Sequence, residues 1–267
     1  MTETSYLLIS NWQLLGSALL LLINLLLSWC MGLRLERSLG MASLRMVVQL
    51  LLVGYLLQWL FQIPSPPLIL TIALIMATVA GIAGVNRIPR RFLGIYRQSI
   101  LSILVSSGLV CGLSLVLILQ VDPWYNPQYL IPLLGMVLGN TLNGISLGLN
   151  AFTESLVVHQ DEIEALLALG ATRWEAAHAQ IQNALRTGMI PSINSMVVMG
   201  LVSLPGMMTG QILAGAEPSE AVRYQIVIVF MIVSGTALGT LGVVLMAFTR
   251  LFTPRHQLRL DRLQMPQ

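Results

Sequence analysis

The sequence predicts an all-α polytopic membrane protein with seven transmembrane helices, an external N-terminus and a cytoplasmic C-terminus. First, 56% of the 267 residues are hydrophobic and 9% are charged, with a mean hydropathy of +0.81. Soluble domains carry roughly 25% charged residues, so this chain cannot cover a surface in water. Second, its apolar runs reach the length of about 20 residues that crosses a bilayer core. Third, its basic residues lie between these runs, which indicates the orientation.

The apolar runs place seven spans along a single transmembrane domain that covers residues 1–267. Turn-forming residues separate several of the runs, as at Pro64–Pro67 and Asp122–Pro127. The predicted spans cover residues 13–33, 46–63, 68–85, 99–119, 128–150, 190–215 and 224–249.

The basic residues set the predicted topology. The chain has 14 arginines and no lysine, and Arg223 is the one arginine at the opposite face from the others. Because basic residues accumulate on the cytoplasmic side, the first, third and fifth connections and the C-terminal tail are predicted to be cytoplasmic. Arginines at helix ends report orientation, so the net charge of +3 predicts no nucleic-acid partner. The thirteen cytoplasmic arginines are Arg34, Arg37, Arg45, Arg87, Arg90, Arg91, Arg97, Arg173, Arg186, Arg250, Arg255, Arg259 and Arg262.

The later spans contain pairs of glycines four residues apart. Small residues at this spacing let helix backbones approach closely, within one subunit or between two. Packing within the subunit is the more ordinary outcome. No Asp, Glu, Lys or His lies in the middle of a span, which argues against a proton- or sodium-coupled transporter. The pairs are Gly135 with Gly139, Gly144 with Gly148, Gly206 with Gly210, and Gly235 with Gly239.

The fifth connection, at about residues 155–188, differs from the rest because it is charged and rich in alanine. Its apolar residues recur at helical spacing, first from Asp161 and then from Trp174. Gly170 is suited to end the first helix, since glycine adopts a left-handed conformation without penalty. Thr172 followed three residues later by Glu175 predicts a capping box that starts the second helix. The sequence therefore predicts a helix, a sharp turn and a second helix.

Two interpretations of this helix pair remain open. Amphipathic helices commonly lie on the lipid headgroups, which would give the segment a purely structural role. A rigid polar helix between spans can instead dock in the groove of a soluble partner, through anchors at helical spacing.

The stretch "EALLALGATRWEA" resembles the EAA-type coupling loop of ABC-transporter permeases, which docks on the ATPase subunit. The match rests on the Glu-Ala start and on the glycine two turns later. Leu166 replaces the second alanine of the pattern, and Pro191 lies later than the usual proline. The resemblance implies an ATPase-coupling role for Glu164, Ala165, Gly170, Ala171, Thr172, Arg173 and Trp174.

Three further stretches resemble one permease family, the FetB-like iron-export permeases of bacteria with their plant relatives in aluminium tolerance. The stretches are Ala42–Tyr55, Gly139–Asn150 and Met189–Gly215, and the most specific run is "LPGMMTGQ". The resemblance implies a plasma-membrane permease for iron or another metal, working as a homodimer with two cytosolic ABC ATPase subunits. The chain has no lysine and no GxxxxGK[ST] motif, so it is expected not to be an enzyme. ATP and magnesium would bind the ATPase, and this chain would hold no cofactor.

Span six contains the predicted moving part of the translocation path. Pro205 removes a helical hydrogen bond and Gly206 loosens the same point, which predicts a kink. The methionines near it could ligate a soft metal weakly or could pack flexibly around the kink, so no metal site is assigned. Two asparagines of span five could line the path or hydrogen-bond to a neighbouring helix. The candidates are Asn140, Asn143, Ser203, Pro205, Gly206, Met207, Met208 and Gln211.

Other functions remain as alternatives. The solute could differ, for example a nucleotide sugar, and the chain could be a membrane scaffold that transports nothing. A membrane-embedded enzyme would need converging ionisable groups, which the spans lack. His159, His178 and His256 are far apart in the sequence and are expected to be solvated.

Overall fold

The computed structural model describes residues 10–62 and 65–264, and it is almost entirely helical. The chain divides into two compact units. The first comprises Met1–Pro64 with Gln211–Ala216, and the second comprises Ser65–Gly210 with Glu217–Gln267.

The first unit contains two long apolar helices, α1 (Asn11–Cys30) and α2 (Glu36–Gln62). Ser10 and Gln13 form a capping box that starts α1. The connection is held by Ser28, whose Oγ donates to the Glu36 carboxylate at 2.7 Å and accepts the Leu35 N–H at 3.0 Å. Leucines cover both helices and are largely exposed, as expected for surfaces that face lipid.

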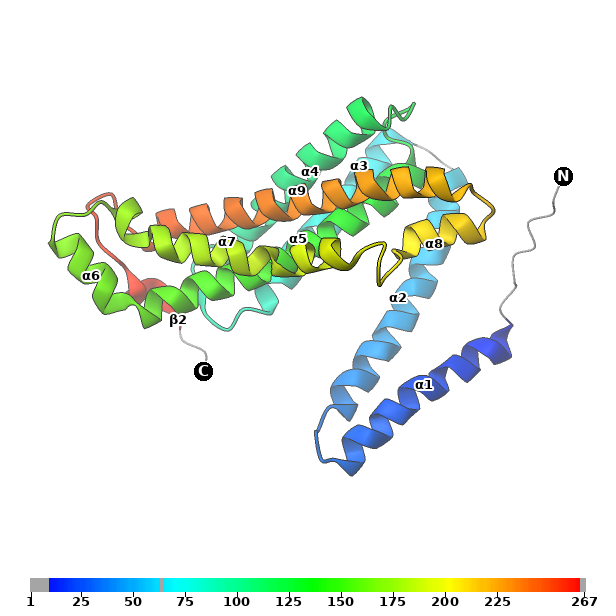
Figure 1. Ribbon diagram of the computed structural model, residues 1–267, viewed down its shortest axis with the longest axis horizontal. Helices are drawn as coiled ribbons and strands as arrows, with labels where there is room; N and C mark the ends of the chain where they lie inside the picture. The colour runs from blue at the N-terminus through cyan, green and yellow to red at the C-terminus, as the bar shows by residue number, and fades with distance from the viewer. Residues whose placement is uncertain (1–9, 63–64, 265–267) are drawn as a thin grey trace. The chain divides into compact units, whose positions relative to one another are not determined.

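The second unit is built around α5 (Pro127–Val158), which packs against α7 (Arg173–Val198) and α9 (Pro218–Leu251). These three helices run side by side over most of their length (Figure 1). α3 and α4 pack against each other and against α5. The remaining elements of this unit are α3 (Pro66–Asn86), β1 (Arg91–Phe92), α4 (Ile95–Leu113), the π-helical turn η1 (Ser114–Ile118), α6 (Gln160–Ala168), η2 (Leu260–Arg262) and β2 (Leu263–Gln264). The short helix α8 (Gly206–Leu213) begins in the second unit, and its residues from Gln211 on belong to the first.

Small residues bring α5, α7 and α9 close together. A Cβ atom placed on Gly148 would lie 2.5 Å from Thr240 Cγ2 of α9, and one on Gly188 of α7 would lie 2.8 Å from the Gly144 carbonyl oxygen. Ser102 of α4 donates to the carbonyl of Gly239 at 2.7 Å. The glycine pairs of α5 and α9 at these contacts therefore pack helices within the subunit.

Within the described residues, six helices are long and apolar enough to cross a membrane: α1, α2, α3, α4 with η1, α5 and α9. They correspond to six of the seven predicted spans. The predicted sixth span, residues 190–215, is not one helix. Its first part is the end of α7, which continues from the polar segment through Pro191 without interruption, and its last part is the short helix α8.

The predicted kink at Pro205 is wrong in form, because the chain leaves the helix at Val198. Residues 199–205 form a loop in which Gly200, at a φ of +82°, donates its N–H to the Ser203 carbonyl at 2.9 Å. Met199 is extended, and Pro205 precedes the first residue of α8. A left-handed glycine and a proline five residues later together remove more helical hydrogen bonds than a proline alone.

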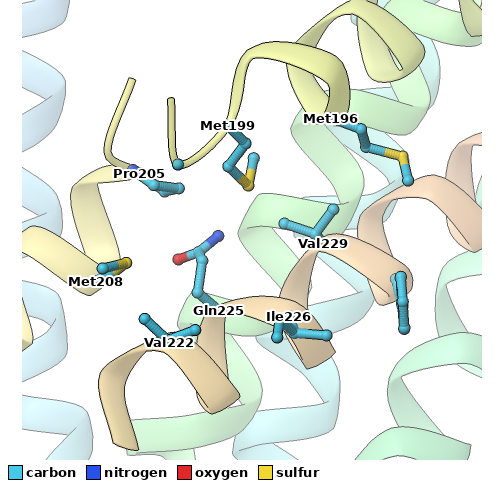
Figure 2. Close-up of a pocket in the computed structure, with 10 residues that line it drawn as sticks. Met196, Met199, Pro205, Met208, Val222, Gln225, Ile226 and Val229 are labelled. Atoms are coloured by element: carbon cyan, nitrogen blue, oxygen red, sulfur yellow. The ribbon is translucent and has the colours of Figure 1, made fainter. Parts of the chain in front are cut away.

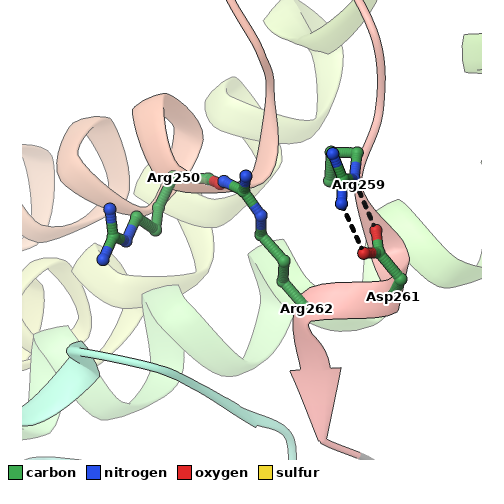
Figure 3. Close-up of polar contacts among 4 residues, drawn as sticks. All are labelled: Arg250, Arg259, Asp261 and Arg262. Atoms are coloured by element: carbon green, nitrogen blue, oxygen red, sulfur yellow. Dashed lines mark hydrogen bonds and ion pairs between the residues drawn. The ribbon is translucent and has the colours of Figure 1, made fainter.

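After α9 the chain turns back along the end of the helix bundle. Phe252 and Leu263 are buried, and β2 pairs antiparallel with β1, so the tail is joined to the connection between α3 and α4. The Arg259 guanidinium donates two hydrogen bonds of 2.8 Å to the Asp261 carboxylate (Figure 3). Arg262 donates to the Arg250 carbonyl at 2.6 Å. The tail is thus an ordered part of the second unit.

Candidate functional site

The turn between α6 and α7 has the form that the sequence predicts. Gly170 is left-handed, with a φ of +95°. Its N–H donates to the Leu167 carbonyl at 3.1 Å, and the Ala171 N–H donates to the Leu166 carbonyl at 3.0 Å. This pair of bonds is a Schellman motif, which closes the end of α6. Glycine is required here because a side chain at this φ is strained.

The predicted capping box at the start of α7 is confirmed. The Glu175 carboxylate accepts from the Thr172 backbone N–H at 2.7 Å and from its hydroxyl at 2.8 Å. The Thr172 hydroxyl in turn accepts the Glu175 N–H at 3.3 Å. These hydrogen bonds from Thr172 lower the pKa of the Glu175 carboxyl from its ordinary value of 4.5.

The C-terminal tail provides a second cap for α7 that the sequence did not reveal. The backbone N–H of Arg173 donates to Nδ1 of His256 at 2.8 Å. His256 is solvent-exposed, as expected, but it also satisfies one of the free N–H groups at the helix start. The two residues are 83 positions apart, so no local pattern could have indicated the contact.

Aromatic contacts hold the first turn of α7 against the end of α9. The Trp174 ring meets the Phe248 ring edge-on, with centroids 5.8 Å apart, and the Arg173 guanidinium lies 5.6 Å from the same ring. Phe248 then packs on Phe252 of the tail at 5.1 Å. The turn is therefore braced by α9 and by the tail.

The opposite side of the turn is exposed and partly apolar. Leu169 is 85% exposed and Trp174 is 46% exposed, whereas Ile163 is fully buried and anchors α6. Glu164 is exposed and accepts a hydrogen bond from Gln160 at 2.8 Å. The predicted coupling residues thus lie together at one end of the α5, α7 and α9 helices (Figure 1), in a segment that we name the α6–α7 turn (residues 160–175).

Two adjoining cavities lie at the other end of α7, where the helix breaks. They measure about 410 and 250 Å³ and are bordered by α7, α8 and α9, with α5 closing the smaller one. Both are lined by Met196, Met199, Pro205, Gln225 and Val229, and we name them together the break pocket (Figure 2).

The structure brings five of the eight predicted path residues to the break pocket. Pro205 lines both cavities; Met208 lines the larger, and Asn140, Gly206 and Met207 line the smaller. Asn140 also donates to the Met136 carbonyl of its own helix at 2.9 Å.

The other three predicted path residues lie elsewhere. Asn143 accepts a hydrogen bond from Arg87 at 2.6 Å, so it joins α5 to the end of α3, which is the helix-to-helix alternative. Ser203 is an exposed loop residue, and Gln211 belongs to the first unit.

Gln225 is the pocket residue that sequence reasoning missed most clearly. It is 7% exposed, and among the described residues its Oε1 has no hydrogen-bond partner. Its signal was weak because it lies near the start of the predicted seventh span, where polar residues are ordinary. Within residues 10–62 and 65–264, no three His, Cys, Asp or Glu side chains lie together as a metal site.

The chain has several long apolar helices, and only 9% of its residues are charged. These features define a multi-pass α-helical membrane protein. The chain belongs to the uncharacterised protein family UPF0014, whose sequence profile matches residues 11–252. It is 40% identical over 250 residues to the UPF0014 membrane protein slr1647 of Synechocystis sp., which covers 93% of this chain and 94% of that relative.

Two further relatives confirm the resemblance to FetB-like permeases. The probable iron export permease protein FetB of Escherichia coli is 32% identical over 259 residues, covering 96% of this chain and 97% of FetB. Protein ALUMINUM SENSITIVE 3 of Arabidopsis thaliana is 31% identical over 247 residues, covering 91% and 88% respectively. No solved structure matches the chain. The protein is a multi-pass protein of the plasma membrane.

Proposed function

We propose that this chain is the membrane-spanning subunit of an ABC transporter that exports a metal ion and is driven by a separate ATPase. The observation that carries the proposal is the α6–α7 turn, which is braced on one side while its other side is exposed. The relative named as a probable iron export permease supports a transport role, since it aligns over 97% of its length.

The ATPase must come from another chain because this sequence has no lysine and no P-loop. The turn offers that ATPase a helix end with an apolar tip at Leu169 and a flanking carboxylate at Glu164. Anchors of this kind suit the groove of a soluble protein. Because Leu169 is mostly exposed and acidic residues lie near it, the turn is better suited to a protein partner than to the surface of the lipid headgroups.

α7 connects the turn directly to the break pocket. Its 26 residues extend about 39 Å at 1.5 Å per residue. The helix begins at the capped turn and ends at Val198, beside Met199 and Pro205 of the pocket. A movement of the turn would therefore be delivered to the pocket by one continuous helix.

The proposed topology keeps seven crossings. The end of α7, the loop and α8 would make the sixth crossing as a broken helix. By the positive-inside rule, the α6–α7 turn would lie in the cytoplasm and the N-terminus outside. Broken helices at membrane depth occur where they line a cavity, as this loop does. In this proposal two copies of the chain assemble with two ATPase subunits.

The coupling role is tested by co-purification with a P-loop ATPase subunit from the same cells, together with the ATP turnover of that subunit. We expect Trp174→Glu and Gly170→Pro to lose association and stimulated turnover while the chain still inserts in the membrane. Trp124→Glu is the matched control, since Trp124 is 44% exposed but lies in the connection predicted to be external. Unchanged association and turnover in both turn variants would reject the role.

The cargo requires a separate measurement. Cells that lack this gene should accumulate metal, which elemental analysis of washed cells would detect. Unchanged metal content with intact ATPase coupling would favour another solute, such as a nucleotide sugar. A chain that binds the ATPase without altering its turnover would be a scaffold.

A further inference from the structure

The break pocket gathers neutral sulfur and amide donors from separate segments. Met199 follows α7, Met208 is on α8 and Gln225 is on α9. Figure 2 shows the side chains of these three residues directed into the same space. Met196 lines both cavities, and Met136 and Met207 line the smaller one. Five of the chain's 14 methionines therefore border the break pocket.

Gln225 gives an independent indication that the pocket holds a ligand. Its side chain is more than nine-tenths buried, and its Oε1 has no partner among the described residues. An unpaired amide in a buried site is unfavourable, and such groups are ordinarily satisfied by a neighbour, a water molecule or a ligand. In Figure 2 the Gln225 amide lies between the thioethers of Met208 and Met199, with its oxygen on the side of Met208.

The donor set selects the chemistry of that ligand. Thioether sulfur is a soft donor that favours ions such as Cu(I), whereas hard ions favour carboxylate and water oxygen. The lining contains no Asp, Glu, His or Cys among the described residues. An ion bound there would therefore have no counter-charge in a low-dielectric site. The free-energy cost of this is smaller for a monovalent cation than for a more highly charged one.

We propose that the break pocket binds a soft monovalent cation of the Cu(I) or Ag(I) type, through the thioethers of Met199 and Met208 and the Oε1 of Gln225. The inference that this cation is cargo rests on the proposed transport function. Met199 adjoins the end of α7, and Met208 lies beyond the loop on α8. A movement of α7 would separate the two sulfur atoms and release the ion.

The test uses the full chain, purified in nanodiscs without ATPase or nucleotide, and Ag(I) as the probe. Because thiols bind Ag(I), all variants carry Cys30→Ser and Cys111→Ala, which remove both cysteines of the chain. Bound silver is measured by equilibrium dialysis with elemental analysis. We expect one Ag(I) per chain, and silver–sulfur scattering in its X-ray absorption spectrum.

Met199→Leu, Met208→Leu and Gln225→Leu should each weaken binding by at least about tenfold, since even outer-shell changes at metal sites cost 10–100-fold. Met246→Leu is the matched control, because Met246 lines a different cavity between α4 and α9. Leucine is close to methionine in volume, so these variants are expected to fold, as gel filtration would verify.

The proposal is overturned if the control weakens binding as much as the pocket variants do, or if the spectrum shows no sulfur ligand. It is also overturned if Fe(II) displaces Ag(I) at equal concentration. These outcomes are distinct from failure of the coupling role. The binding assay contains no ATPase, and the coupling assay contains no metal-dependent step.

Discussion

The two ends of α7 differ in how they are held. At the start, the first turn is capped by Thr172 and by His256 and is packed on Phe248. At the other end the helix runs into an extended Met199 beside a cavity, and the loop that follows is open, with Leu201 88% exposed. One helix is therefore braced at the surface and loosely held at the break.

This difference suits the two ends of α7 to different tasks, contact with a partner at the start and movement at the end. A braced start can transmit a force from a docked partner without fraying, because the N–H groups of Thr172, Arg173 and Glu175 are already bonded. A loosely held end can change position at small cost, because few contacts oppose the movement. Changes that weaken the braced end or block the middle of α7 should therefore impair function by different routes.

The largest effect is expected in the middle of α7. Gly188→Val would place a side chain against the α5 backbone, 2.8 Å from the Gly144 carbonyl oxygen. Overpacking of this kind should destabilise the chain by about 1–3 kcal/mol. Thermal unfolding in detergent measures the loss.

Gly139→Val is the matched control for Gly188→Val. Gly139 is also within a long helix, α5, but a Cβ there meets no described atom within 4 Å. Its effect should be confined to helix propensity, which favours valine over glycine by a few tenths of a kcal/mol. Equal melting temperatures for the two variants would contradict the close α5–α7 contact.

The next effect concerns the local cap. Thr172→Ala removes the hydroxyl that accepts the Glu175 N–H, which should cost about 1 kcal/mol of helix stability. Amide hydrogen exchange in the first turn of α7 should accelerate, while exchange near the break pocket stays unchanged. Thr71→Ala is the control, because the Thr71 hydroxyl bonds to a carbonyl within its own helix. Faster exchange along the whole of α7 would show that the two ends are not independent.

Sequence reasoning succeeded at the braced end where the determinants are local. Gly170, Thr172 and Glu175 lie within six positions, and each acts on the backbone beside it. The bond from Arg173 to His256 was beyond reach because it depends on how the tail folds back on the bundle.

At the break, the amino-acid composition indicated where the helix is interrupted but not the length or conformation of the interruption. Pro205 predicts an interruption, yet the extent of the loop depends on Gly200 and its bond to Ser203. Four of the path residues, at positions 205–208, were found because proline, glycine and methionine cluster in one run, and Asn140 was found as a polar residue within span five. Gln225 was missed because its burial comes from the packing of α9 against the loop, which no local spacing encodes.

A smaller effect is expected for the tail contact. His256→Ala leaves the Arg173 N–H without its acceptor at an exposed site, which should cost about 0.5–1 kcal/mol. The readout is ATP turnover of the complex together with exchange of the Arg173 amide. His256→Asn should restore part of both, since its side-chain oxygen can accept the same hydrogen. Full coupling in the alanine variant would show that the tail is dispensable for bracing.

The smallest effect is a pH dependence at the braced end. The pKa of Glu175 is lowered in the folded chain by its bonds from Thr172, so its ionised form favours folding. That contribution is complete above the ordinary value of 4.5 and is lost as pH falls through the lowered pKa. Melting temperatures of the wild type should therefore decline more steeply below that value than those of Glu175→Gln. The carboxyl is fully exposed, so the difference should shrink in high salt, and parallel curves at low salt would contradict the ionised cap.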